Sequence, residues 1–267
     1  MYYLLTEDFK QQETKLVEMI TAILPVEKIY LLGSTLQQRR TETIFMVDAP
    51  SCRKVSHYYL LVLVDANCRF SNNQLQDKIE NTCRSFIPIT AIAMNIQQFK
   101  EWLNEGHQFA ATVVNMAMLI YDGNNIALKA ITTTQVDIDD NKKSYAEQFA
   151  MTNEFIAGAE LYINRKQNAM ALFMLHQAAE QALHLILQRG TGLHINTHNI
   201  ERLLRYCSMV SYKIPELFNR ANEMGERLFQ LLQKAYITTR YKKDGDISAN
   251  QVLLLLERVK TLSDYTD

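Results

Sequence analysis

The spacing of hydrophobic residues changes near the middle of the chain. In the first part, short apolar runs alternate with segments of helical period, and from residue 145 onward only the helical period remains. This change predicts an α+β domain followed by an all-α domain. Strands are expected at residues 26–32, 41–47, 55–65, 87–94 and 116–121.

Four helices are expected in the same part of the chain, one before the first strand and three between later strands. They cover residues 9–24, 72–86, 96–104 and 107–114. Pro25 ends the first of them, and Ser71 is placed to cap the second. The result is a mixed sheet with helices in residues 1–130.

A polar, Asp-containing segment at residues 131–144 predicts a linker, and residues 145–267 then form an antiparallel helical bundle. Its helices are expected at residues 145–164, 169–188, 199–207, 215–241 and 252–262. Asn196 or Thr197 is expected to cap the third helix, and Ser248 opens the fifth with capping-box spacing.

Charge and cysteine content exclude several classes of protein. The net charge of −1 divides into about −4 for residues 1–140 and about +3 for residues 141–267, which is too mild for a protein that coats nucleic acid. The four cysteines lack metal-ligand spacing, so free thiols are expected. No secretory signal or membrane span is evident, and we expect a cytoplasmic protein with no membrane partner.

Gly33 and Ser34 close an apolar run, which predicts a strand that feeds a tight turn able to hold a phosphate. With the central run at residues 55–65, they resemble the first two strands of the small nucleotidyltransferase fold. In that family the Gly-Ser turn binds the nucleotide triphosphate, and an Asp-x-Asp pair on the second strand holds magnesium. The corresponding positions here are His57 and Tyr59.

The resemblance thus implies a nucleotide site without its metal ligands. The family's third Asp corresponds to Thr90 or a neighbour, none of them acidic. Magnesium prefers hard carboxylate oxygens, and nucleotidyl transfer relies on that ion, so we expect no cofactor and no catalysis. A purely structural Gly33-Ser34 turn is the alternative interpretation, and Asp65 is expected to be a turn or capping residue.

Residues 175–183 resemble the signature helix of the HEPN domain, a bundle of four or five helices, and the similarity continues at residues 234–241. A nucleotidyltransferase-like domain followed by a HEPN domain is a known combination. Many HEPN domains are ribonucleases that use an Arg followed four to six residues later by a His, near a dimer interface. No His follows Arg240 in that window. The resemblance therefore implies a homodimer through the bundle, without RNA cleavage.

The basic cluster at the end of the fourth helix has two interpretations. Arg240, Lys242 and Lys243 can simply face the negative end of the helix dipole, an effect of about 0.3–1 kcal/mol each. Alternatively, with Tyr236 and Tyr241 beside them, they form a nucleotide site in which Arg240 contacts phosphate and Tyr241 stacks on a base.

The histidines of the second half are expected to be structural. His176 and Glu180 are four residues apart on an apolar helix face, which predicts a buried polar pair. His184, His194 and His198 are close in sequence only, and His194 and His198 flank a helix start, so no metal site is expected there.

These observations favour a non-catalytic protein that binds a nucleotide or an RNA fragment. Two alternatives remain. One is an active magnesium-dependent nucleotidyltransferase with atypical ligands, for which Asp48 and Asp65 would be the first carboxylates to examine. The other is a protein-interaction module that binds no nucleotide.

Overall fold

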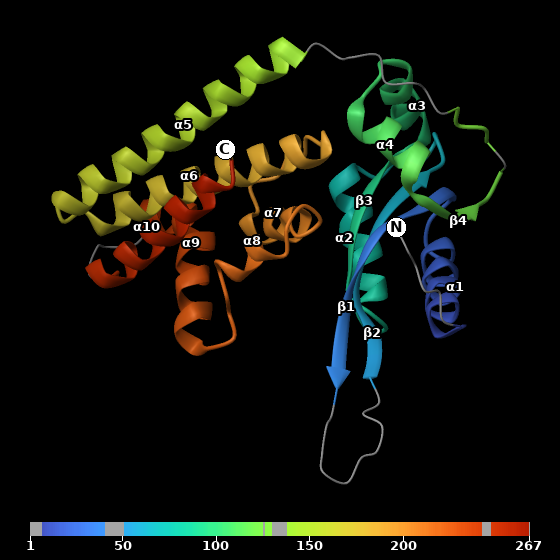
Figure 1. Ribbon diagram of the computed structural model, residues 1–267, viewed down its shortest axis with the longest axis horizontal. Coiled ribbons are helices and arrows are strands. Elements are labelled where there is room, and N and C mark those ends of the chain that lie inside the picture. The colour runs from blue at the N-terminus through green and yellow to red at the C-terminus, as the bar shows by residue number, and fades with distance from the viewer. Residues whose placement is uncertain (1–6, 41–50, 125, 130–137, 242–246, 267) are drawn as a thin grey trace, which may run out of the picture. The chain divides into compact units, whose positions relative to one another are not determined.

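The computed structural model describes residues 7–40, 51–124, 126–129, 138–241 and 247–266 (Figure 1). The chain divides into two compact units, residues 1–134 and 135–267. Across the described ranges, no helix is long and apolar enough to cross a membrane. The fold class is the predicted one, an α+β unit with a mixed sheet followed by a helical unit.

The first unit is built on a four-stranded sheet in the order β3-β2-β1-β4. β2 pairs antiparallel with β1 and parallel with β3, and β1 pairs antiparallel with β4. Its strands are β1 (Val26–Arg40), β2 (Ser51–Val64), β3 (Ile89–Asn95) and β4 (Met118–Asp122). Residues 60–64 of β2 are buried, as expected for the near-continuous apolar run of a central strand.

The predicted tight turn at Gly33-Ser34 is wrong, because β1 continues through both residues to Arg40. Gly33 pairs with Tyr59 and Ser34 with Tyr58. A Cβ added at Gly33 would lie 3.8 Å from Cδ2 of Tyr59, an ordinary contact, so the neighbouring ring lies beside the glycine. The predicted strand at residues 41–47 lies outside the described residues.

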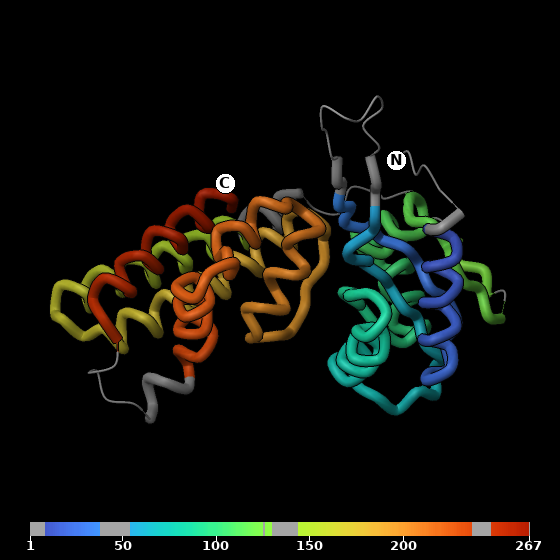
Figure 2. Tube along the Cα trace, turned by 90° about the horizontal axis from the view of Figure 1, so that it is seen from below, coloured from blue at the N-terminus to red at the C-terminus, as the bar shows by residue number. Residues whose placement is uncertain are grey.

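Helices cover the sheet. Figure 2 shows the backbone course of α1 and α2 in the first unit. Their side chains join those of the strands in one hydrophobic core, which includes Leu16, Leu60 and Leu75. On the other side of the core strands, α3 contacts β2 and β3. These helices are α1 (Glu7–Thr21), α2 (Asn72–Cys83), α3 (Ile96–Asn104) and α4 (Gln108–Met116). The predicted Ser71 cap is confirmed, and with Gln74 it forms a capping box.

The β3 edge of the sheet has a side-chain hydrogen-bond partner. The backbone N–H of Ala91 donates to Oε1 of Glu80, on α2, at 3.2 Å. The Glu80 carboxylate therefore lies against β3, an edge strand of the sheet.

In the second unit α6 is the central helix, and it packs against α5, α7, α9 and α10. Its side chains from Leu172 to Leu187 include most of the buried apolar residues of the helix. The helices are α5 (Ile138–Asn164), α6 (Asn168–Thr191), α7 (Ile200–Cys207), α8 (Lys213–Glu216), α9 (Glu223–Tyr241) and α10 (Ala249–Asp264). α6 ends at Gly192 in the left-handed conformation, and Ser248 forms the predicted capping box.

Three details of this unit differ from expectation. α5 begins at Ile138, inside the segment predicted as linker. Asn199, and neither Asn196 nor Thr197, caps α7 by accepting from the N–H of Arg202. The long helix predicted at residues 215–241 is two helices, because the side chain of Asn222 accepts from the N–H of Gly225 and starts α9 there.

Candidate functional site

The three positions that correspond to the nucleotidyltransferase carboxylates lie together on one face of the sheet. Thr90 of β3 is the register partner of Tyr59 in β2. His57 is two residues before Tyr59 and therefore faces the same side. Its Nε2 shares a hydrogen bond of 2.8 Å with Oγ1 of Thr90, and its ring centroid is 4.9 Å from that of Tyr59. We call His57, Tyr59 and Thr90 the sheet cluster.

β1 completes the surroundings of the sheet cluster. Thr35 pairs with His57 in the register, and its hydroxyl lies 3.4 Å from the hydroxyl of Tyr59. Ser56 donates a hydrogen bond of 3.2 Å to the carbonyl of Thr35 at a shift in the β1–β2 register. Such an irregularity turns neighbouring side chains relative to a regular ladder.

Burial limits what each member of the sheet cluster can contact. Thr90 and Tyr59 are buried, with 1% and 8% of their surfaces exposed, whereas His57 is partly exposed. Tyr59 therefore does not offer its ring to a base, and His57 is the member that a ligand can reach. The cluster supplies an imidazole and hydroxyl groups, which can exchange hydrogen bonds with a ligand.

The carboxylates of the alternative interpretation do not join the sheet cluster in the described residues. Asp65 follows the opposite end of β2 and is a turn residue, as predicted, since its Oδ1 accepts from the N–H of Asn67 at 2.7 Å. Its eight-residue separation from His57 corresponds to roughly 26 Å along a strand. Asp48 lies outside the described residues. Within the described part of the chain, no three His, Cys, Asp or Glu side chains are grouped to hold a metal.

The second predicted site, at the end of α9, is only partly described. Tyr236 is 45% exposed, and its ring centroid lies 6.3 Å from that of Phe173 on α6. Arg240 and Tyr241 form the last turn of α9, but their side chains lie outside the described residues, as do Lys242 and Lys243 entirely. The structure thus places Tyr236 at the surface near the predicted cluster.

A further group of polar residues surrounds Glu180 in α6. Glu180 is buried, and its Oε1 accepts a hydrogen bond of 2.9 Å from Nδ1 of His198. Its Oε2 lies 3.6 Å from Nε2 of the buried His176, as the predicted pair requires. Nδ1 of His176 donates to the carbonyl of Leu232 in α9 at 2.9 Å. We call His176, Glu180 and His198 the helical cluster.

Opposing effects act on the pKa of Glu180. Burial raises the pKa of this carboxyl, but hydrogen bonds and the positive charges of His176 and His198 outweigh burial, so its pKa lies below the ordinary value. The Glu180 side chain is therefore an ionised carboxylate at neutral pH. It lies between two helices and the segment before α7.

Sequence reasoning missed the part of His198 in this group. The separation of 18 residues between Glu180 and His198 has no helical meaning, because the chain turns back after Gly192. A second contact holds the returning segment, since Nε2 of His184 donates to the carbonyl of Thr197 at 3.0 Å. The expectation that His184, His194 and His198 are close in sequence only is wrong for the first two, because the ring centroids of His184 and His194 lie 6.1 Å apart.

The comparisons with known proteins concern mainly the second unit. Residues 146–266 match the family model described as the HEPN domain. The helical unit is a HEPN domain. This confirms the HEPN resemblance inferred from the sequence, and α6 with Glu180 lies within the matched residues.

The other comparisons add little to this. Among solved structures, the chain is similar to a nucleotidyltransferase-like protein from Exiguobacterium sibiricum, with 12% identity and a TM-score of 0.31, over 96% of this chain and 74% of that one. This TM-score is too low to carry an argument. No curated protein matches the chain.

Proposed function

We propose that the protein binds a nucleotide or a short RNA and does not transfer nucleotidyl groups. The observation that carries the proposal is the sheet cluster. Its members occupy the positions where the resemblance to nucleotidyltransferases places carboxylates, and the Nε2 of His57 and the hydroxyl of Thr90 are instead 2.8 Å apart in a hydrogen bond. An imidazole and two hydroxyls lack the anionic oxygens that hold magnesium.

The side chains of the sheet cluster can bind a ligand by hydrogen bonds. The partly exposed imidazole of His57 can hydrogen-bond to a phosphate, a ribose hydroxyl or a base edge, while Thr90 fixes the orientation of the ring. The combination with a HEPN domain supports a nucleotide or RNA as the ligand. In this proposal Gly33 and Ser34 belong to the strand that borders the site, and they do not form a phosphate-binding turn.

The end of α9 is a second contact region in this proposal. The exposed ring of Tyr236 is available to stack on a base, and Arg240, Tyr241, Lys242 and Lys243 follow it in the sequence. The proposal also includes a homodimer formed through the HEPN domain.

Calorimetric titration tests the proposal. ATP, AMP and a short single-stranded RNA are titrated into the full chain, with and without magnesium. Binding that is independent of magnesium and is weakened about tenfold by His57→Ala is expected, because a hydrogen bond to a charged group is worth roughly 1.5–3 kcal/mol. His194→Ala, an exposed histidine in the other unit, is the matched control and is expected to bind normally.

Two outcomes contradict the proposal. Uniformly absent heat would favour the protein-interaction module. Magnesium-dependent release of pyrophosphate from labelled triphosphates, abolished by Asp48→Ala, would identify an active nucleotidyltransferase.

A further inference from the structure

The exposed histidine of the helical cluster has the geometry of an activated nucleophile. The side chain of His198 is 82% exposed, whereas that of Glu180 behind it is 6% exposed. The N–H at Nδ1 donates a hydrogen bond to Oε1 of Glu180. In the neutral ring the lone pair is therefore on Nε2, at the other edge of the imidazole. A carboxylate that fixes the tautomer and orientation of a histidine is the general requirement for such a group.

The support behind His198 is rigid. His176 contacts the second oxygen of Glu180 and is itself fixed by the carbonyl of Leu232. The segment that carries His198 is held by the bond from His184 to the carbonyl of Thr197. Leu193 and Ile195 of the same segment are buried. The orientation of the His198 ring is therefore set by Glu180 of α6, whose second oxygen contacts His176.

We propose that His198 accepts a phosphoryl group at Nε2 from a small-molecule acyl phosphate. The lone pair of Nε2 attacks phosphorus, the N–P bond forms, and the bond from phosphorus to the acyl oxygen breaks. The leaving carboxylate takes that electron pair. The proton stays on Nδ1, and the ring becomes cationic, so its hydrogen bond to the Glu180 carboxylate strengthens.

Two features favour phosphoryl transfer over acid–base chemistry on a bound substrate. The imidazole is exposed on the surface, where a small donor can approach it freely. Asn199, the next residue, caps α7, so a transferred phosphoryl group would lie near the positive end of that helix dipole. The proposal uses no residue of the sheet cluster and does not depend on nucleotide binding.

Treatment of the full chain with acetyl phosphate tests the proposal. Phosphohistidine is located by peptide mass spectrometry at alkaline pH, where the N–P bond survives, and the ring isomer is assigned by phosphorus NMR. His194 is an internal control, because it is an exposed histidine of the same segment that does not contact Glu180 in the described contacts. His198 is expected to react about tenfold faster than His194, the size of one charge-assisted hydrogen bond.

Glu180→Gln gives the decisive comparison, since it keeps an oxygen acceptor and removes the charge. The ratio of the two rates is expected to fall to about one, while Gln181→Ala, at the neighbouring half-buried position, leaves it unchanged. Equal rates in the wild-type chain, or an unchanged ratio in folded Glu180→Gln, overturn the proposal. If that variant does not fold, the isomer at residue 198 decides, because phosphorylation at Nδ1 contradicts the observed contact and phosphorylation at Nε2 supports the proposal.

Discussion

The sheet cluster and the helical cluster place a histidine in different electrostatic surroundings. In the first unit His57 shares a hydrogen bond with the hydroxyl of Thr90. In the second unit His198 and His176 both contact the ionised carboxylate of Glu180. A histidine thus contacts a hydroxyl in one unit and an ionised carboxylate in the other.

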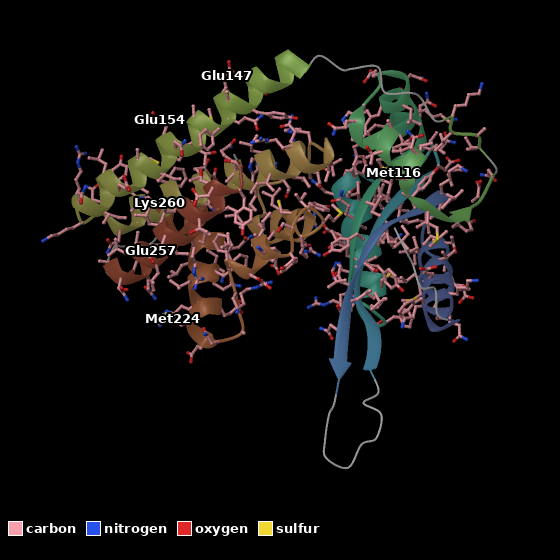
Figure 3. The ribbon with its side chains drawn as sticks, in the orientation of Figure 1. Met116, Glu147, Glu154, Met224, Glu257 and Lys260 are labelled. Atoms are coloured by element: carbon pink, nitrogen blue, oxygen red, sulfur yellow. The ribbon has the colours of Figure 1, made fainter. Side chains whose placement is uncertain are left out.

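This difference separates the two clusters energetically. A hydroxyl partner can be removed at the cost of one hydrogen bond, whereas loss of the buried carboxylate removes a charged acceptor from two imidazoles. We therefore expect the helical cluster to matter more for stability, since Glu180 and His176 are buried. Figure 3 shows the side chains of the two units on the ribbon. The sheet cluster is expected to matter more for ligand contacts.

The largest effect is expected from Glu180→Ala. Removal of this buried carboxylate should lower the free energy of unfolding of the helical unit by about 3 kcal/mol, because it removes the acceptor that two histidines contact and opens a cavity. Urea titration followed by far-UV circular dichroism measures the change. Gln181→Ala, at the half-buried neighbouring position, is the matched control and should change it by less than about 0.5 kcal/mol.

The unit affected can be identified in the same experiment. Trp102, the single tryptophan, lies in α3 of the first unit and stacks on His107 with ring centroids 4.4 Å apart. Its fluorescence should report an unchanged transition in Glu180→Ala. A loss of stability below about 1 kcal/mol would show that the charges of the helical cluster contribute no more than a neutral hydrogen bond.

A smaller effect should appear in the pH dependence of stability. Folding lowers the pKa of Glu180, so the unfolded chain binds this proton more readily, and the stabilisation is present above the ordinary value of 4.5 and is lost as the pH falls through the folded value. Burial lowers the pKa of His184, so its contribution is lost in the same direction, starting below 6.5.

Two acid-side losses of stability are therefore expected in the wild-type chain. Thermal unfolding between pH 7 and pH 3 measures them. Glu180→Gln should lack the loss that begins near pH 4.5 and keep the one that begins near 6.5. An identical acid profile for both chains would contradict the assignment of this loss to Glu180.

Thr90→Val tests the sheet cluster and should cost about 1 kcal/mol, the usual net value of one hydrogen bond. The substitution keeps the shape of the buried side chain and removes the hydroxyl that contacts His57. Trp102 fluorescence during urea unfolding measures the change. Thr112→Val, at an exposed position of α4, is the control and should be close to neutral. A loss as large as that of Glu180→Ala would remove the contrast between the clusters.

The smallest effect is expected from Gly33→Ala. A Cβ there would meet Tyr59 at 3.8 Å, so stability should change by less than about 0.5 kcal/mol. Gly123→Ala is the contrasting variant in the same unit, since its Cβ would lie 2.9 Å from the carbonyl oxygen of Val26 and the backbone must shift. Thermal unfolding of both variants provides the measurement. A strongly destabilised Gly33→Ala would contradict the room for a Cβ that the structure shows beside Gly33.

Local signals predicted much of the fold. The bounds of α3 agree with expectation, and the caps at Ser71 and Ser248 were evident because a capping box needs only four consecutive residues. The extended course of β1 through Gly33 depends on pairing with β2, which no short window of sequence contains. The local sequence Gly-Ser is compatible with a turn and also with a strand beside an aromatic residue of the neighbouring strand. The dipeptide alone therefore does not distinguish the two structures.

In the candidate sites too, contacts within one strand or helix could be predicted from the sequence, whereas contacts between distant segments could not. His57 and Tyr59 are two residues apart on one strand, so their common face followed from the period of a strand. The pair of His176 and Glu180 followed from the period of a helix. The contact of His198 with Glu180 depends on where the chain returns after α6, and the pattern of apolar residues does not determine that path.

The carboxylate of Glu80 against the backbone of β3 has a consequence for self-association. An incoming strand from another molecule would need the N–H of Ala91, which already donates to Glu80, and its own carbonyl oxygen would approach that negative charge. Addition of a strand at the β3 edge would therefore first have to displace the Glu80 carboxylate from the N–H of Ala91. Glu80 thus protects the β3 edge from pairing with another chain, and it comes from α2, a helix that also contributes to the core.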